Sequence, residues 1–259
     1  MSNTPQTPEK QADHSIDTAT GQEAPAEISS ARVKKIFTDI AWKYERFNKL
    51  SSFGQYRSWL RTLIDKSPIT SETLMLDIAG GTGDMTFTAC ERKQPKHIIL
   101  SDYTPAMLEV AQSRLDAGEA NGVPVELAVV DGQDIPYEDR SFDIITMSYG
   151  IRNMPERERA LSEMYRVLKP GGALCVLEFS TPPNPLMRLG YNLYLRWGIP
   201  TWGKIVTGDA SGFVYLAKSI KAFPDQKGFT RMLKNAGFSR VEYTNVTFGV
   251  AAVHIAYKG

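Results

Sequence analysis

Two acidic residues and three glycines occur at a spacing that is typical of a nucleoside-binding site. Asp77 ends an apolar run, and Gly80, Gly81 and Gly83 follow it directly. Glycines in such a turn let the backbone take a positive φ and leave amide groups open to a ligand where a Cβ would clash. Asp102 ends the next apolar run, about 20 residues further on, where an acid commonly binds the two hydroxyls of a ribose. These residues predict a nucleoside-binding turn after a buried strand.

The same turn does not fit the common phosphate-binding motifs. A dinucleotide-binding loop has a third glycine where this chain has Thr86, and no Gly-Lys-Ser/Thr follows for a mononucleotide-binding loop. Asp84, at the start of the expected helix, would repel a phosphate. A nucleoside that carries positive charge and no phosphate fits better, and S-adenosylmethionine, a sulfonium with an amino acid tail, is such a ligand. A plain strand-to-helix turn without a ligand is the alternative.

Composition favours one globular domain and argues against several classes of protein. The chain has 259 residues, of which 42% are hydrophobic, enough for one α/β domain with a buried core. Thirty basic and 29 acidic residues leave a net charge of +1, so we expect no nucleic acid partner. Cys90 and Cys175 lack metal-ligand spacing and the three histidines are scattered, so we predict no metal site.

The N-terminal segment differs from the rest of the chain. Residues 1–30 are rich in Pro, Thr, Gln, Glu, Asp and Ala, which predicts a disordered tail. Its five acidic residues argue against a transit peptide, and it has no apolar stretch of the kind that signals secretion. We therefore expect a cytoplasmic protein whose folded domain spans residues 31–259.

Strands and helices are expected to alternate along that domain. Residues 31–65 are aromatic and helical in period, which predicts a helical cap before the sheet. The expected elements that follow are strand 73–78, helix 84–93, strand 97–101, helix 105–120, strands 125–130 and 142–148, helix 156–168, strand 173–179, helix 226–236, and strands 239–246 and 250–258. Lys169-Pro170-Gly171-Gly172 is expected to close the helix before it. This rhythm is typical of a doubly wound parallel sheet, and the short turn at 247–249 predicts an antiparallel final strand.

Several longer motifs resemble one enzyme family. Residues 166–180, Arg-Val-Leu-Lys-Pro-Gly-Gly-Ala-Leu-Cys-Val-Leu-Glu-Phe-Ser, satisfy a signature of the UbiE/MenG family, class I S-adenosylmethionine methyltransferases that methylate a ring carbon of quinols. A second signature is weakened, because Glu45 and Phe47 replace its Asp and Met, and Tyr56 stands where its histidine is usual. Further matches are residues 150–153, 215–220 and 249–254. The resemblance runs from about Val33 to Lys258.

The resemblance implies a fold and a cofactor site. The fold is Rossmann-like α/β, with a seven-stranded, mostly parallel sheet, an antiparallel terminal strand, the N-terminal helical cap at 31–65 and a substrate-cover insertion at 181–225. The predicted cofactor-binding residues are Asp77, Gly81, Thr82, Gly83, Asp102, Asp131, Gly132 and Ser148. Asp102 can accept hydrogen bonds from the ribose diol and Asp131 from the adenine amino group. As alternatives, both acids are ordinary turn formers, and Asp77 is either a satisfied buried acid or the partner of the cofactor ammonium.

Methyl transfer to a quinol carbon needs the acceptor aligned with the sulfonium and a hydroxyl that loses its proton. Arg152 and Asn153, which leave the fourth strand at its carboxyl end, are the candidates for holding the phenolate oxygen. A surface ion pair with Glu156 or Glu158 is the alternative for Arg152. Tyr44, the third predicted catalytic residue, is expected to overhang the pocket or to pack in the core.

The substrate side rests on four residues and one segment. The predicted substrate-binding residues are Asn48, Tyr191, Tyr215 and His254, with a satisfied core imidazole as the alternative for His254. Residues 184–202 combine aromatic and aliphatic side chains with two arginines, too polar to span a membrane. This segment is expected to cradle a polyprenyl tail or to lie in the membrane interface at the inner face. A helix packed on the sheet and a homodimer contact are its alternatives.

The preferred function is the C-methylation of demethylmenaquinol, with 2-methoxy-6-polyprenyl-1,4-benzoquinol as the second acceptor. The preference rests on residues 247–252, which look closer to naphthoquinol enzymes. An amino-group methyltransferase is disfavoured, because Asp/Asn-Pro-Pro-Tyr/Phe does not follow the fourth strand. A nicotinamide-dependent oxidoreductase and a non-catalytic cofactor-binding partner protein are the alternatives from other classes.

Overall fold

A computed structural model describes residues 52, 54–201 and 211–259. The predicted tail at 1–30 and most of the predicted helical cap, with Tyr44 and Asn48, lie outside the described residues. The same holds for residues 202–210 of the predicted cover insertion. The expectations for these parts therefore stay predictions.

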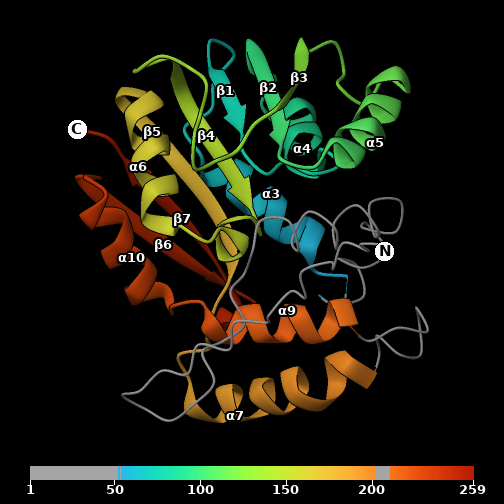
Figure 1. Cartoon of the computed structure of the whole chain (residues 1–259), viewed down its shortest axis with the longest axis vertical. Coiled ribbons are helices and arrows are strands. Elements are labelled where there is room, and N and C mark those ends of the chain that lie inside the picture. Colours follow the sequence, from blue (N-terminus) through green and yellow to red (C-terminus); the bar gives the residue numbers. More distant parts are fainter. Residues whose placement is uncertain (1–51, 53, 202–210) are drawn as a thin grey trace, which may run out of the picture.

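The described chain follows the predicted alternation of strands and helices. Its elements are α3(Tyr56–Lys66), β1(Leu74–Asp77), α4(Asp84–Arg92), β2(His97–Asp102), α5(Pro105–Asp116), β3(Val125–Val129), β4(Phe142–Ser148), η2(Ile151–Asn153), α6(Arg157–Val167), β5(Leu168–Phe179), α7(Pro185–Leu193), η3(Tyr194–Gly198), α9(Ser211–Ala222), α10(Gln226–Asn235), β6(Arg240–Val246), η4(Thr247–Gly249) and β7(Ala251–Tyr257). The strands form one sheet in the order β3-β2-β1-β4-β5-β7-β6 (Figure 1). Strands β1 to β5 run parallel to one another, and β7 runs antiparallel to both of its neighbours, β5 and β6. The predicted sheet and its antiparallel final strand are thus confirmed.

Helices cover both faces of the sheet because neighbouring residues of each strand face opposite layers. On β1, Met75 packs in a cluster with Leu63 of α3 and Met85 of α4. The next residue, Leu76, packs in a second cluster with Leu161 of α6 and, further along, Leu233 of α10. Figure 1 shows α7 and α9 stacked across the end of the sheet toward which β1, β2 and β4 point. That end therefore lies beneath a cover of helices.

Two predicted boundaries differ from the structure by more than two residues. Lys169-Pro170-Gly171-Gly172 does not close the preceding helix, because α6 ends at Val167 and β5 begins at once with Leu168. These four residues are not paired with β4 and form a bulge in β5. The Gly171 amide donates to the Lys258 carbonyl at 2.9 Å, and this bond holds the bulge in place. Helix α5 ends at Asp116 instead of 120, because Gly118 turns the chain with a φ of 83°.

Asp77 joins three elements at the end of β1. Its carboxylate is buried and accepts hydrogen bonds from Thr86 Oγ1 of α4 at 2.8 Å and from Thr146 Oγ1 of β4 at 2.7 Å. Its own carbonyl accepts from Ser101 Oγ of β2 at 2.9 Å. Burial raises the pKa of Asp77 to about 6, while the two threonine hydroxyls act in the opposite direction. Asp77 therefore has a structural role, because its hydrogen bonds link β1 to α4, β4 and β2.

We expect Asp77→Asn to flatten the pH dependence of stability. With a pKa of about 6 in the folded chain and about 3.9 unfolded, the folded state binds the proton more strongly. This contribution to the free energy of unfolding is complete below pH ~4 and is lost as the pH rises through about 6, a change of about 3 kcal/mol. Urea unfolding from pH 4 to 8, without cofactor, measures it.

Asp65→Asn is the matched control, because Asp65 lies at the surface, where Arg92 lowers its pKa. This variant should keep the loss of stability between pH 4 and 7. An Asp77→Asn protein with the full wild-type pH dependence would contradict the assignment.

Candidate active site

A pocket opens at the carboxyl ends of β1, β2 and β4, where the turns that follow these strands meet. The space between the protein atoms that line it is about 740 Å³, open solvent included. Its lining residues are Ile78, Ala79, Gly81, Asp102, Tyr103, Thr104, Met107, Val130, Asp131, Gly132, Gln133, Ser148, Tyr149, Gly150, Asn153, Met154 and Pro155. Five of the predicted cofactor-binding residues are thus brought together here, namely Gly81, Asp102, Asp131, Gly132 and Ser148.

The turn after β1 has its shape because two of its positions admit no side chain. A Cβ on Gly80 would collide with Leu100 Cδ1, and Gly83 starts α4 with a φ of 92°. The turn directs the Gly81 amide at Asp102 Oδ2, 2.9 Å away. The glycine loop and the acid after β2 therefore form one unit, as their spacing predicts.

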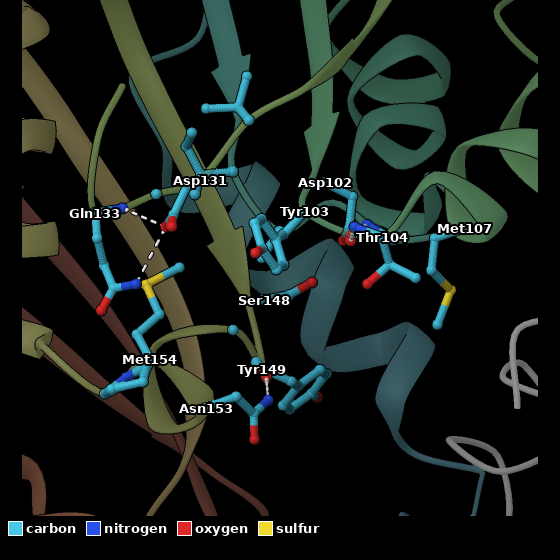
Figure 2. Close-up of a pocket in the computed structure, with 17 residues that line it drawn as sticks. Asp102, Tyr103, Thr104, Met107, Asp131, Gln133, Ser148, Tyr149, Asn153 and Met154 are labelled. Atoms are coloured by element: carbon cyan, nitrogen blue, oxygen red, sulfur yellow. Dashed lines mark hydrogen bonds between the residues drawn. The ribbon is translucent and has the colours of Figure 1, made fainter. Parts of the chain in front are cut away.

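Asp102 and Asp131 lie on opposite sides of the pocket, with Tyr103 and Ser148 between them (Figure 2). Each oxygen of Asp102 accepts one backbone amide, Oδ2 from Gly81 and Oδ1 from Thr104 at 2.8 Å. Burial raises the pKa of Asp102, and the two amides counteract it. Since a carboxylate oxygen accepts more than one hydrogen bond, Asp102 keeps acceptor capacity for a diol. This geometry suits its predicted role at a ribose.

The Asp131 side is built by the loop between β3 and β4. Asp131 Oδ1 accepts from the Gln133 amide at 2.9 Å and from Gln133 Nε2 at 3.2 Å. Gln133 Oε1 in turn accepts from the Glu156 amide at 2.8 Å, which ties the loop to the start of α6. A Cβ on Gly132 would lie 2.7 Å from Met154 Cε, so this position is close-packed against the pocket wall. Tyr103, Gln133 and Met154 also line the pocket and were not predicted; their positions next to the predicted acids and after Asn153 were the available signal.

A second, smaller pocket continues from the first on the α3 side. Its lining residues are Tyr56, Leu60, Ala79, Gly80, Gly81, Thr82, Asp84, Ser148 and Tyr149. Thr82 Oγ1 and Asp84 Oδ2 are buried there and have no hydrogen-bond partner among the described residues. Asp84 Oδ1 pairs with Arg114 at 2.8 Å. An acid with a free oxygen is therefore available for a cationic group.

That acid is Asp84 rather than Asp77. Both oxygens of Asp77 are bonded to threonines, and Asp77 is not among the lining residues of either pocket. The geometry fits the interpretation of Asp77 as a satisfied buried acid. In the sequence, Asp84 argued against a phosphate but was not predicted as a partner for an ammonium group.

The backbone is strained where the two central strands end. Ala79 after β1 and Tyr149 after β4 have φ values of 52° and 57°, in the left-handed region that side chains disfavour. They lie close together, since a Cβ on Gly150 would be 2.8 Å from the Ala79 Cβ. Such strain is typical of functional sites.

A buried ion pair lies next to the pocket. Arg152 Nη1 donates to Glu178 Oε1 at 2.7 Å and to the Tyr149 carbonyl at 2.6 Å. The guanidinium Cζ lies 5.7 Å from the centre of the Tyr149 ring and 5.3 Å from that of Phe179. The alternative for Arg152, a surface pair with Glu156 or Glu158, is wrong, because the side chain is buried and its partner is Glu178.

Three other predicted residues gather near this pair. Asn153 Nδ2 donates to the Tyr149 carbonyl at 3.0 Å, and the Tyr215 hydroxyl donates to Asn153 Oδ1 at 3.0 Å. Tyr191 of α7 has a buried hydroxyl with no hydrogen-bond partner among the described residues. Burial raises the pKa of Tyr191, and the charges of Arg152 and Glu178 reach it. Glu178 itself was missed, although it stands within the signature at residues 166–180.

His254 is not brought to the pocket. It lies on β7, where its ring packs against Phe229 and Tyr243, with centroids 5.0 and 5.5 Å apart. Its Nε2 lies 3.2 Å from the Gln226 carbonyl, and burial lowers its pKa to about 4, so the ring is neutral at pH 7. This placement fits a core imidazole better than a substrate contact.

The described part of the chain has no cluster of side chains that could bind a metal ion. Within residues 52, 54–201 and 211–259, no group of three or more His, Cys, Asp or Glu side chains is placed to hold a metal ion. Cys90 and Cys175 are buried free thiols, and burial raises the pKa of each to about 12.

Comparisons with known proteins agree with this geometry. The profile of the ubiE/COQ5 methyltransferase family matches residues 26–258. The chain is 42% identical over 237 residues to the ubiquinone/menaquinone biosynthesis C-methyltransferase UbiE of Francisella tularensis subsp. novicida, covering 91% of this chain and 94% of the relative. It is 43% identical to the UbiE of Dinoroseobacter shibae, covering 87% and 90%.

Solved structures agree on the fold. An S-adenosylmethionine-dependent methyltransferase of Thermotoga maritima superposes with a TM-score of 0.60 at 21% identity, covering 87% of this chain and 99% of that one. The family profile, the two curated relatives and the site at the carboxyl ends of the strands lead to the same assignment. The chain belongs to the ubiE/COQ5 methyltransferase family.

Proposed function

We propose that the chain transfers the methyl group of S-adenosylmethionine to a ring carbon of a polyprenyl quinol, with demethylmenaquinol as the preferred acceptor. As a member of its family, the chain is an S-adenosylmethionine-dependent C-methyltransferase. The relatives' names join ubiquinone and menaquinone biosynthesis, so 2-methoxy-6-polyprenyl-1,4-benzoquinol is the second acceptor in the proposal. The preference for the naphthoquinol rests on residues 247–252.

The observation that carries the proposal is the placement of Arg152 and Asn153. Asn153 lines the nucleoside pocket, and Arg152 is buried beside it with an Nε that has no hydrogen-bond partner among the described residues. A quinol carbon becomes nucleophilic when the adjacent hydroxyl loses its proton, and donors at that oxygen stabilise the charge. A guanidinium does not itself act as a base, so Arg152 holds the phenolate and the proton leaves by another route.

The pocket fits S-adenosylmethionine, which supplies an electrophilic methyl group when bound. In this proposal Asp102 accepts from the ribose hydroxyls, Asp131 from the adenine amino group, and Tyr103 lies against the base. The free Oδ2 of Asp84 and Thr82 Oγ1 are the groups that would hold the amino acid end. The acidic residues around both pockets suit a cationic ligand better than a pyrophosphate.

We expect S-adenosylhomocysteine to raise the melting temperature and NADH not to do so. Asp102→Ala should weaken S-adenosylhomocysteine binding roughly tenfold or more, because two hydroxyls lose their acceptor. Asp116→Ala, at the exposed end of α5, should bind like the wild type. Thermal-shift titration and calorimetry measure these effects. Stabilisation by NADH alone would contradict the assignment of this pocket to S-adenosylmethionine.

We expect Arg152→Ala and Asn153→Ala each to lower the rate of quinol methylation, with cofactor binding kept in Arg152→Ala, because Arg152 lines neither pocket. Loss of a donor at the developing phenolate should lower kcat about 100-fold. In a deletion strain complemented with either variant, mass spectrometry of the quinone pool should show the desmethyl quinone. Arg92→Ala, which removes an exposed ion pair with Asp65, is the control and should restore the methylated quinone. A normal pool with Arg152→Ala and with Asn153→Ala would support the non-catalytic alternative.

The outer face of α7 and η3 suggests how a lipid substrate reaches the site. Leu186, Leu189, Leu193 and Trp197 recur at helical spacing and are between 53% and 76% exposed. Two arginines, Arg188 and Arg196, accompany them, and no acidic residue stands in the sequence between Glu178 and Asp209. No described helix has the length and apolar character needed to cross a bilayer. We propose that this face lies in the interface of an anionic membrane.

We expect Leu189→Glu and Trp197→Glu to lower the fraction of protein that co-sediments with phosphatidylglycerol vesicles, about tenfold each, because each buries a charge in the apolar interface. Val129→Glu, at an equally exposed apolar position on the edge strand β3, is the control and should bind like the wild type. Unchanged sedimentation combined with loss of a dimer in size-exclusion chromatography would instead assign the face to a second copy of the chain.

A further inference from the structure

We propose that Glu178 is a positioning residue for the methylation. It fixes the orientation of the Arg152 guanidinium toward the quinol oxygen and partly offsets the positive charge of Arg152 near this oxygen. The proposal rests on the proposed quinol substrate. It concerns a residue near the carboxyl end of β5 that contacts Arg152; neither residue lines a pocket, but Asn153, next to Arg152, does.

Hydrogen bonds leave the guanidinium little freedom to turn. Glu178 Oε1 accepts from Arg152 Nη1 at 2.7 Å and from the Phe179 amide at 2.8 Å. The second hydrogen of Nη1 reaches the Tyr149 carbonyl at 2.6 Å. The Arg152 backbone amide also points at Glu178 Oε2, 3.4 Å away. With Nη1 held in this way, the Nε hydrogen and the two Nη2 hydrogens are the guanidinium donors that remain for the substrate.

The charge of Glu178 acts strongly on nearby groups because its surroundings are weakly polar. Arg152 is 5% exposed and Glu178 2%, and the rings of Tyr149 and Phe179 pack beside the guanidinium with centroids 4.9 Å apart. In such a weakly polar site, a charge several ångströms from the reacting oxygen shifts its pKa more than in water. Burial raises the pKa of Glu178, while the charge of Arg152 and the Phe179 amide lower it. In its ionised form Glu178 offsets the charge of Arg152, so the bound hydroxyl ionises at a higher pH than it would beside an unpaired guanidinium.

Neighbouring elements add few other charges. Burial lowers the pKa of Arg157 on α6, and the charge of Glu178 counteracts this effect. Arg157 Nη2 donates to the Arg152 carbonyl at 3.0 Å. Tyr191 of α7 and Tyr215 of α9 face the site with phenol groups, and Tyr215 is bonded to Asn153. Glu178 is the acid in direct contact with Arg152, so its removal changes the charge of the pair from neutral to positive.

Two substitutions separate position from charge. Glu178→Gln keeps the length and an oxygen acceptor for Nη1 but removes the negative charge. We expect the acidic limb of the pH profile of kcat to move down by about one pH unit, with S-adenosylhomocysteine binding unchanged. Glu178→Asp keeps the charge but withdraws the carboxylate by one methylene. We expect kcat to fall about tenfold with the limb in place, because the guanidinium follows its partner.

The assay uses the full chain with reduced short-chain demethylmenaquinone as the acceptor. Glu163→Gln is the matched control, because Glu163 pairs with Arg166 at 2.8 Å on α6, outside both pocket linings, and should keep the wild-type profile. A purely structural role would lower the melting temperature of the Glu178 variants and leave kcat and the pH limb unchanged.

An unchanged pH limb in Glu178→Gln, or one moved to higher pH, overturns the proposal. If Glu178→Gln does not fold, the Asp variant decides, and a wild-type kcat there overturns it. Absence of methylation by the wild-type chain would instead remove the proposed function, and this inference with it.

Discussion

A charge buried away from water must be paired, and this constraint shapes the end of the sheet where the site lies. Arg152 and Glu178 come from the ends of the neighbouring strands β4 and β5, and their contact at 2.7 Å holds η2 against β5. Asn153, next along η2, then lines the pocket and receives the Tyr215 hydroxyl from α9. Removing either charge would leave the other uncompensated, so the pair couples the integrity of this region to the chemistry proposed for it.

The nucleoside side depends on close packing instead of charge. Gly80 passes so near Leu100 that no side chain fits, and a Cβ on Gly150 would lie 2.8 Å from the Ala79 Cβ. The left-handed backbone at Ala79 and Tyr149 costs free energy that the surrounding sheet must offset. Because both strained residues line the pocket, the packing that holds them also brings the ends of β1 and β4 together, which places the proposed cofactor pocket beside Asn153.

Much of this arrangement could be predicted from the sequence, because local rules determine it. Strand alternation, the glycine turn and the spacing to Asp102 each depend on residues near in sequence, and the β7 reversal follows from a short turn. What could not be predicted depends on residues far apart. Whether Asp77 faces a ligand is decided by Thr146, 69 positions away, and the partner of Arg152 is Glu178, 26 positions away, instead of the nearby Glu156. The bulge at Lys169–Gly172 likewise depends on Lys258.

Helix α7 brings the two halves of the proposed function together. Its residues alternate between two environments at helical spacing: Tyr191 turns a buried hydroxyl to the Arg152 site, whereas Leu189 and Leu193 are exposed on the other side. A polyprenyl quinol has the same division, with a polar ring that must leave the lipid and a tail that gains nothing by doing so. A single amphipathic helix over the pocket would let the ring reach the methyl donor while the tail stays in apolar surroundings. The proposed reaction requires a lipid-soluble acceptor and a charged, water-soluble cofactor to meet in one small space. The exposed leucines would keep the tail of the acceptor in lipid, and the buried ion pair would bind its polar ring.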